Sequence, residues 1–556
     1  MHESNSTWCS RVAGSKASTQ DNNSCLLSSD YGMATAVLVI CYVILLCSLW
    51  AYGLVDPSDG WYAEPAREMF EKHEYLTPFL NYQPFYEKPI GIYWCILFWY
   101  QIFGVHEFAA RLPSAIAAVM TSAFAFQTLW SLGMKRTALL SGLTIIGSPL
   151  LATIGHICLT DMVFTACLAA CVLSLFAYVN GLSVRYWYLG YVALAAAVLV
   201  KGPMAFLFSF AIFVSYGLVH ADTIRGSRAA NAFQVFKCLN PLLGIPLALA
   251  ISLPWYAYET VSSHGAFFHE FIVRQHLERA SGQVNHLQPW YYYLEVLGAG
   301  CAPWYMFLLG YRDVKRQVFN GRTVRANLTK LCALWIVIIV GAFSCSQAKL
   351  DTYVLPAVPP LAILCAIGLE YIWRFRQARL LKALAALVFV VAIGCLIGIA
   401  LSKGLWSDFD DLIRVLIPLF IFAVLPNFIV LLSKKISRQV LVMTASYALA
   451  TGLGVAFIVH AYDETKSLPL RKMIAVARRE NGSLATFMRD SPTVVFYWGR
   501  YVPYMKTAED FQAFMKNSPA PHFVLATDDV VPATMNACPG LTRVEESKKW
   551  WLLRAD

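Results

Sequence analysis

Apolar runs of about 20 residues recur along most of this chain, and they limit what it can fold into. Each run is long enough to cross a hydrocarbon core of about 30 Å as a helix. Helices are expected because each satisfies its own backbone hydrogen bonds in lipid. With 58% hydrophobic and 14% charged residues among 556, the composition agrees. The sequence therefore predicts a mainly α, polytopic membrane protein.

The basic residues indicate which runs span and which way they point. If Met1 is cytoplasmic, most Lys and Arg fall in cytoplasmic loops, as the positive-inside rule requires. This holds only if the shorter run 90–104 does not cross, so it is predicted to be an interfacial or re-entrant helix. The predicted spans, about thirteen, are 33–54, 111–133, 137–155, 162–181, 186–200, 203–220, 240–258, 290–311, 330–348, 352–372, 380–401, 411–433 and 439–460.

Three regions follow from this topology. Residues 1–32, rich in Ser and Asn, are predicted to be a disordered cytoplasmic segment. Residues 33–460 form the transmembrane domain, with a long external loop at 55–110. Residues 461–556 are more polar and lie outside the cytoplasm. There a basic helix LRKMIAVARRENG, ending at Gly482, precedes strand-like TVVFYW and HFVLAT, with AEDFQAFMKN between them, which predicts a small α/β domain.

Unusual polar residues gather in the non-cytoplasmic loops. They are Asp56, Asp59, Glu87 and Lys88 in the first loop, then Asp161, Lys201 in KGP, Arg274 and His276, and finally Lys349 and Asp351. Ionisable groups near membrane depth are costly and usually mark a functional path. Simpler interpretations compete: Glu64, Arg67 and Glu68 are typical of a solvated helix face with a local ion pair. Arg111 is expected to extend its side chain to the membrane interface. For Lys201, a functional role and the same snorkelling to the interface are given equal weight.

These loops suit one kind of chemistry better than others. Carboxylates can position or deprotonate an acceptor, cations can hold a phosphate leaving group, and aromatic faces can hold a sugar. This set of carboxylates, cations and aromatic rings fits an enzyme that transfers a sugar from a lipid phosphate. A transporter of lipid-linked sugars stays open, but it predicts charges and broken pairs inside helices, of which Arg414 is the one candidate. Nucleic-acid binding is excluded, because helix-end Lys and Arg explain the net charge of +10.

The segments DPSDGWYAEPAREMF, FYEKPIGIYW and FGVHEFAARLPSAIAA resemble the first external loop and second helix of the lipid A aminoarabinose transferases. The likeness continues through TDMVFT, LVKGPMAFL, QHLER with PWYYYL, and AKLDTYVLP. More broadly the chain is similar to the GT-C class of polyprenyl-phosphate glycosyltransferases, which includes the protein O-mannosyltransferases.

The resemblance implies a GT-C fold and a glycosyltransferase that moves 4-amino-4-deoxy-L-arabinose from undecaprenyl phosphate to lipid A phosphates. This would occur on the periplasmic face of the bacterial inner membrane, with the C-terminal domain on the same side, and would confer polymyxin resistance. The implied partners are the lipid-linked sugar donor, a lipid A or other lipid or protein acceptor, and membrane lipids. The chain is expected to work as a monomer.

The resemblance also assigns roles to residues. It implies catalytic acids at Asp59 and Asp161, and a pair, Glu87 and His276, that could hold zinc or another divalent metal. Lys88, Lys201 and Lys349 would face phosphates, and Arg274, Tyr62 and Tyr353 would contact substrate. Two departures from the family's pattern matter. Ser58-Asp59-Gly60-Trp61 replaces an acidic pair followed by arginine, so Asp56 could share the first acid's role. KLDTY replaces KLPTY. A different sugar or acceptor therefore stays open.

Overall fold

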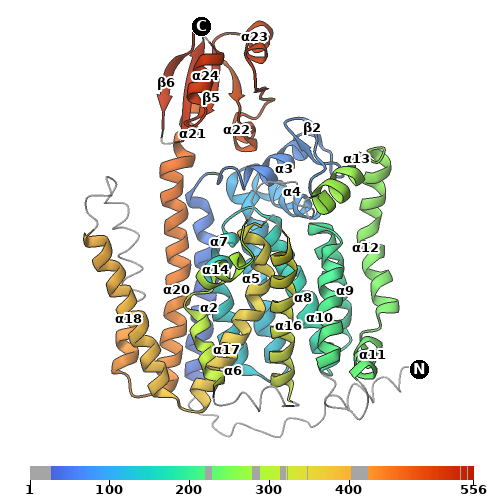
Figure 1. Ribbon diagram of the computed structural model, residues 1–556, viewed down its shortest axis with the longest axis vertical. Helices are drawn as coiled ribbons and strands as arrows, with labels where there is room; N and C mark the ends of the chain where they lie inside the picture. Colours follow the sequence, from blue (N-terminus) through green and yellow to red (C-terminus); the bar gives the residue numbers. More distant parts are fainter. Residues whose placement is uncertain are drawn as a thin grey trace.

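Helices dominate the computed structural model, which describes residues 27–219, 228–278, 288–312, 321, 323–346, 349–401, 424–538, 540–547 and 549–555. Long helices stand side by side in a bundle, with a small sheet unit beyond one end (Figure 1). They are α2 Leu27–Cys47, α5 Glu107–Ser131, α8 Thr160–Val179, α9 Arg185–Lys201, α10 Met204–Val219, α12 Pro241–Ser262, α16 Val324–Cys345, α17 Val358–Arg374, α18 Ala378–Leu401 and α20 Ile436–Tyr462.

The bundle is that of a multi-pass membrane protein. Among the described residues, seven helices are long and apolar enough to cross a membrane, or eight if the bent pair α6 Lys135–Ile146 and α7 Pro149–Gly155 is one span. This pair bends by 60° at Gly147-Ser148-Pro149, because proline cannot continue the hydrogen-bond ladder. Breaks also occur where α14 Tyr292–Gly300 gives way to a 3₁₀ turn, η4 Trp304–Tyr311, and where η5 Asp351–Ala357 precedes α17. Arg414 and much of the predicted span 411–433 lie outside the described residues.

The first loop forms two helices and a hairpin. Helices α3 Gly60–Lys72 and α4 Gly91–Phe103 lie across the ends of the upright helices (Figure 1). At 13 residues, α4 is about 20 Å long, too short to cross 30 Å, which agrees with the predicted non-spanning helix. Between them β1 Phe79–Leu80 and β2 Gln83–Pro84 pair through Asn81 and Tyr82. Both turn residues have positive φ, 49° and 64°, as a tight two-residue hairpin requires.

The C-terminal residues build a five-stranded sheet in the order β4-β3-β5-β7-β6. Strand β3 is parallel to β4 and β5, whereas β7 is antiparallel to β5 and β6. Separate apolar clusters, one around Met473 and Trp550 and another around Phe487 and Phe514, pack on it. The elements are β3 Ser483–Phe487, β4 Tyr504–Met505, β5 His522–Thr527, β6 Thr542–Glu546 and β7 Trp550–Ala555, with α21 Leu468–Arg479, α22 Pro492–Trp498, α23 Ala508–Asn517 and α24 Val531–Ala537.

One strand prediction in this unit is wrong. The stretch TVVFYW, expected as a strand because of its β-branched and aromatic residues, is the helix α22. Pro492 occupies the first turn, where its missing N–H costs nothing, and Gly499 ends the helix in the left-handed region with φ 69°. The helix buries both its valines and Trp498. Tertiary packing therefore overrides strand propensity here, whereas HFVLAT is β5 as predicted.

Candidate active site

A cavity of about 350 Å³ lies where the first loop meets the ends of several long helices. Tyr62 comes from α3, and Glu87 and Lys88 come from the segment after the hairpin. The remaining walls come from the start of α8, the end of α9, the start of α10, the helix η3 His269–Glu278 and residues 342–353. The predicted site residues that line it are Tyr62, Glu87, Lys88, Asp161, Lys201 and Tyr353. Residues more than 290 positions apart in sequence are thus brought to one chamber.

An ion pair between Asp161 and Lys201 forms one wall. Asp161 stands in the first turn of α8, where the helix dipole favours a negative charge. Lys201 is the last residue of α9, and Gly202, with φ 89°, and Pro203 end that helix. The ammonium bonds the Asp161 carboxylate and lies 5.0 Å from the centre of the Tyr353 ring. The end of α9 at Gly202 therefore places the Lys201 ammonium at the cavity, in an ion pair with Asp161.

Glu87 and Lys88 face the same cavity from the segment between β2 and α4. Gly91 explains how this segment comes so close, because a Cβ there would lie 2.7 Å from the Leu199 carbonyl oxygen of α9. Tyr62 lies beside them, its hydroxyl 3.5 Å from Thr160 Oγ1. Burial raises the pKa of Tyr62 well above its usual range, so the phenol stays protonated and can donate a hydrogen bond.

Asp59 lies outside this cavity and is fully buried. Its Oδ2 accepts hydrogen bonds from the Val55 N–H at 2.8 Å and from Arg111 Nη2 at 2.6 Å, and its Oδ1 accepts one from the Cys158 N–H at 2.6 Å. Arg111 also donates to the carbonyls of Tyr52 and Gly53. The predicted snorkelling of Arg111 is wrong, because its side chain has no exposed surface. Asp59 instead ties the first loop to the backbone three residues before Asp161.

Asp56 faces the C-terminal unit. One carboxylate oxygen accepts a hydrogen bond from Ser491 Oγ at 2.9 Å, and the other pairs with Lys549 Nζ at 2.8 Å. A second joint lies at the hairpin, where Asn81 Nδ2 donates to the Val502 carbonyl and its Oδ1 accepts the Val502 N–H, at 2.8 and 3.0 Å. The C-terminal sheet is therefore docked on the first loop, which is the role the structure gives Asp56.

The remaining predicted residues lie at the edge of the site. Lys349 is buried and donates to the carbonyls of Gln288 and Ser346 at 3.0 and 2.5 Å, while its neighbour Leu350 lines the cavity. Arg274, on η3 His269–Glu278, is largely exposed and lies 3.1 Å from Glu270. The side chain of His276, on the same helix, lies outside the described part of the chain.

Of the predicted metal pair, Glu87 and His276, only the Glu87 side chain lies within the described residues. Within the described residues no group of three or more His, Cys, Asp or Glu side chains could hold a metal ion. Glu87 shares its cavity with Lys88 and with an aspartate already paired to Lys201. Glu87 thus lines a cavity with two lysines, and its pairing with His276 around a metal stays a prediction.

The face expected to be solvated on α3 is buried, so that prediction is wrong. Glu64 and Glu68 have no exposed surface, and Arg67 bonds both oxygens of Glu64 at 2.7 Å, which is the local ion pair expected. Coverage by the hairpin and α4 explains the burial. Sequence reasoning also missed uncharged polar residues of the cavity, including Thr160, Gln275 and Thr352, which carry no charge in an apolar context to mark them.

Comparison with known proteins finds similar sequences and a similar fold. Residues 87–255 match the family described as dolichyl-phosphate-mannose-protein mannosyltransferase. The structure of ArnT from Cupriavidus metallidurans bound to undecaprenyl phosphate superposes with a TM-score of 0.77 at 19% identity, over 94% of this chain and 98% of that one. The chain has the fold of that transferase. The same protein in the apo state also gives 0.77.

Curated relatives share the name expected from the sequence. An undecaprenyl phosphate-α-4-amino-4-deoxy-L-arabinose arabinosyl transferase of Enterobacter sp. is 29% identical over 59% of this chain and 58% of its own length. One of Pseudomonas paraeruginosa is 27% identical, over 62% and 60%. The matched stretch thus spans about three fifths of these relatives. The resemblance found in the motifs is confirmed.

Proposed function

We propose that this chain is an integral-membrane glycosyltransferase that moves 4-amino-4-deoxy-L-arabinose from undecaprenyl phosphate to lipid A phosphates. The observation that carries the proposal is the meeting of Asp161, Lys201, Glu87 and Lys88 in one cavity. Two cations suit a phosphate leaving group, and a carboxylate suits a positively charged amino sugar. The motifs and the named relatives supply the donor and the acceptor.

The reaction is a single displacement at the anomeric carbon. The bond from that carbon to the undecaprenyl phosphate oxygen breaks, and the phosphate leaves with the electron pair. A lipid A phosphate oxygen forms the new bond from the opposite face, so the configuration inverts. A phosphate monoester, with a second pKa of about 6, is already largely ionised at neutral pH and needs no strong base.

The cavity residues hold and neutralise charge in this scheme. Lys88 and Lys201 balance the charge that develops on the leaving phosphate, and Asp161 keeps Lys201 at the cavity wall. Tyr62 donates a hydrogen bond to a phosphate or sugar oxygen, and the Tyr353 ring supports both Lys201 and the sugar. Lys349 and Arg274 extend the cationic surface beside the cavity. Asp59 acts through position, by fixing the backbone that leads to Asp161.

The proposed topology follows the relatives and the basic residues. Thirteen spans between residues 33 and 460 place the cavity and the 461–556 unit on the periplasmic side of the bacterial inner membrane, and residues 1–32 in the cytoplasm. Masking lipid A phosphates with an amino sugar lowers the negative surface charge that attracts polymyxin and other cationic peptides. The protein works as a monomer in this scheme. A hydroxyl acceptor, as in protein O-mannosylation, would instead need Asp161 as a base.

Reconstituted protein tests the proposal. With undecaprenyl-phosphate aminoarabinose and lipid A, mass spectrometry should find a pentosamine added to lipid A. Asp161→Asn should abolish at least 99% of the transfer, about 10²-fold or more, while Asp490→Asn, on the C-terminal unit, should leave it unchanged. Donor consumption without a lipid A product would overturn the acceptor, and normal transfer by Asp161→Asn would overturn the site.

A further inference from the structure

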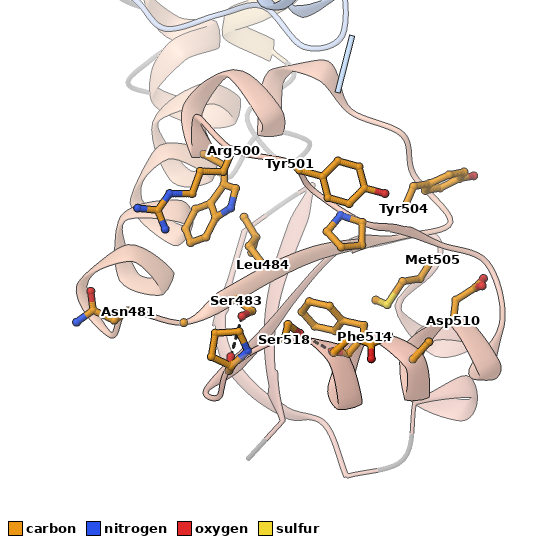
Figure 2. Close-up of a pocket in the computed structure, with 16 residues that line it drawn as sticks. Asn481, Ser483, Leu484, Arg500, Tyr501, Tyr504, Met505, Asp510, Phe514 and Ser518 are labelled. Carbon is orange, nitrogen blue, oxygen red and sulfur yellow. Dashed lines mark hydrogen bonds between the residues drawn. The ribbon is translucent and has the colours of Figure 1, made fainter. Parts of the chain in front are cut away.

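The C-terminal unit carries a second hollow, a groove of about 600 Å³ along the β3–β4 edge of its sheet (Figure 2). Its floor is apolar and buried, made by Leu484, Trp498, Met505 and Phe514. It shares no residue with the cavity described above. The volume falls within the range of about 300 to 1,000 Å³ that small-molecule sites occupy.

The rim of the groove is polar and aromatic. Arg500, Tyr501 and Tyr504 follow one side in Figure 2, and Asp510 lies on the other. The two tyrosines are 56% and 39% exposed. In the part of the chain that the structure describes, the Arg500 guanidinium and the Tyr501 hydroxyl form no hydrogen bond or ion pair with protein. Their bonding capacity is therefore left to solvent or to a ligand.

These groups match a sugar better than other ligands. Tyrosine rings offer flat apolar faces for the C–H faces of a pyranose. Asn481, Asn517 and the Oδ1 of Asp510, whose Oδ2 caps α23, offer partners for hydroxyl or ammonium groups. Arg500 suits an attached phosphate. A lipid tail would desolvate these polar groups without replacing their hydrogen bonds, and a bare phosphate would leave the aromatic faces unused.

The groove adjoins the loop that leads to the cavity. Arg500, Tyr501, Pro503, Tyr504 and Met505 line it, and Val502, a buried residue of the same segment that does not line the groove, exchanges two hydrogen bonds with Asn81 of the hairpin. Tyr82 also donates to the Gly499 carbonyl at 3.3 Å. Glu87 and Lys88 follow the hairpin directly. A ligand held in the groove thus lies against the element that positions the cavity wall.

We propose that this groove is a saccharide-binding subsite for the phosphorylated amino-sugar head of the acceptor glycolipid. The identity of the acceptor rests on the proposed function, whereas the saccharide class rests on the groove alone. Arg500 and Tyr501 are the residues that select a sugar bearing a phosphate. The subsite holds the acceptor beside the first loop and takes no part in bond making.

Saturation-transfer NMR on the full-length protein in nanodiscs tests the saccharide class without any reaction. Nanodiscs are needed because sugar-based detergents would compete. The probes are glucosamine 1-phosphate, glucosamine and inorganic phosphate. We expect saturation of the pyranose protons. Arg500→Ala or Tyr501→Ala should weaken sugar binding about tenfold, and Tyr501→Phe, which keeps the ring and loses only the hydroxyl, should weaken it less. Arg479→Ala, an exposed arginine of α21 outside the groove, is the matched control.

Three NMR results would overturn the subsite. They are a lack of saturation of the sugar protons, saturation that both groove variants leave intact, and complete displacement of the sugar by inorganic phosphate alone, which would indicate an anion site. In the transfer assay, Tyr501→Ala should raise the KM for lipid A about tenfold with kcat kept, and an unchanged KM would also reject it. If wild-type protein transfers no aminoarabinose but still binds the sugar, the proposed function fails and the saccharide site stands.

Discussion

The buried pair of Asp59 and Arg111 gives a prediction that separates structure from catalysis. Both side chains are fully buried, and the carboxylate accepts bonds from the guanidinium and from two backbone N–H groups. Removing one partner of such a pair leaves an uncompensated buried charge and costs about 3–5 kcal/mol. We expect about 3 kcal/mol for Asp59→Asn, which keeps one acceptor oxygen, and about 5 kcal/mol for Asp59→Ala.

Equilibrium unfolding in mixed micelles, followed by tryptophan fluorescence, measures this cost. The double variant Asp59→Ala with Arg111→Met should lose less than the sum of the two single changes, because no buried charge is left unpaired. Transfer activity per folded molecule should fall only modestly in Asp59→Asn. If Asp59→Asn unfolds like wild type but is inactive, the positioning role is refuted and the catalytic role predicted from the sequence is restored.

Two further predictions concern the first loop. Asn81→Ala removes two hydrogen bonds to Val502 and should weaken docking of the C-terminal unit by about 1–3 kcal/mol. Limited proteolysis between the bundle and the sheet should therefore be faster than in wild type, whereas the control Asn536→Ala, on the exposed face of α24, should leave the rate unchanged. Equal cleavage rates for Asn81→Ala and wild type would reject this docking role. Burial raises the pKa of Glu68, so the folded state holds this proton more tightly than the unfolded state. The stabilisation of the folded state that this proton gives is fully present below the pKa of Glu in the unfolded state, about 4.3. It is lost as pH rises through the pKa of Glu68 in the folded state. Glu68→Gln should therefore flatten the fall in unfolding temperature with rising pH, and an identical pH profile would contradict the reasoning.

The helical membrane architecture could be predicted because length and apolar content alone decide it. The run 90–104 was predicted not to span because of the distribution of Lys and Arg, and its helix of 13 residues agrees with that prediction. The misplaced strand TVVFYW shows the limit. Its β-branched residues favour a strand locally, but Pro492, Gly499 and burial against α3 and α21 make it a helix. Local propensity carries no information about such packing.

The cavity could be predicted in part. Asp161 was selected because an isolated charge at the end of an apolar run needs a reason, whereas Lys201 was left open between function and snorkelling. In the structure each is the other's partner. Arg111 followed the same pattern but is bound to Asp59 inside the protein. A sequence shows that a charge lies at membrane depth, but not whether its partner is water, a substrate or another side chain 52 positions away. Thr160 and Thr352 carry no such mark at all.

The roles of Asp56 and Asp59 show what the first loop does. The departure from the family's acidic pair suggested that these two residues share one catalytic role. In the structure they face different partners, since Asp56 bonds Lys549 and Ser491 of the C-terminal unit whereas Asp59 bonds Arg111 and the Cys158 N–H. The segment between them is thus fixed at one end to the sheet and at the other to the backbone that begins α8. The helix α3 follows at once and carries Tyr62 to the cavity, so docking of the sheet and placement of Asp161 are mechanically linked. A substitution at either carboxylate should therefore alter the cavity by moving its residues, not by removing a catalytic group.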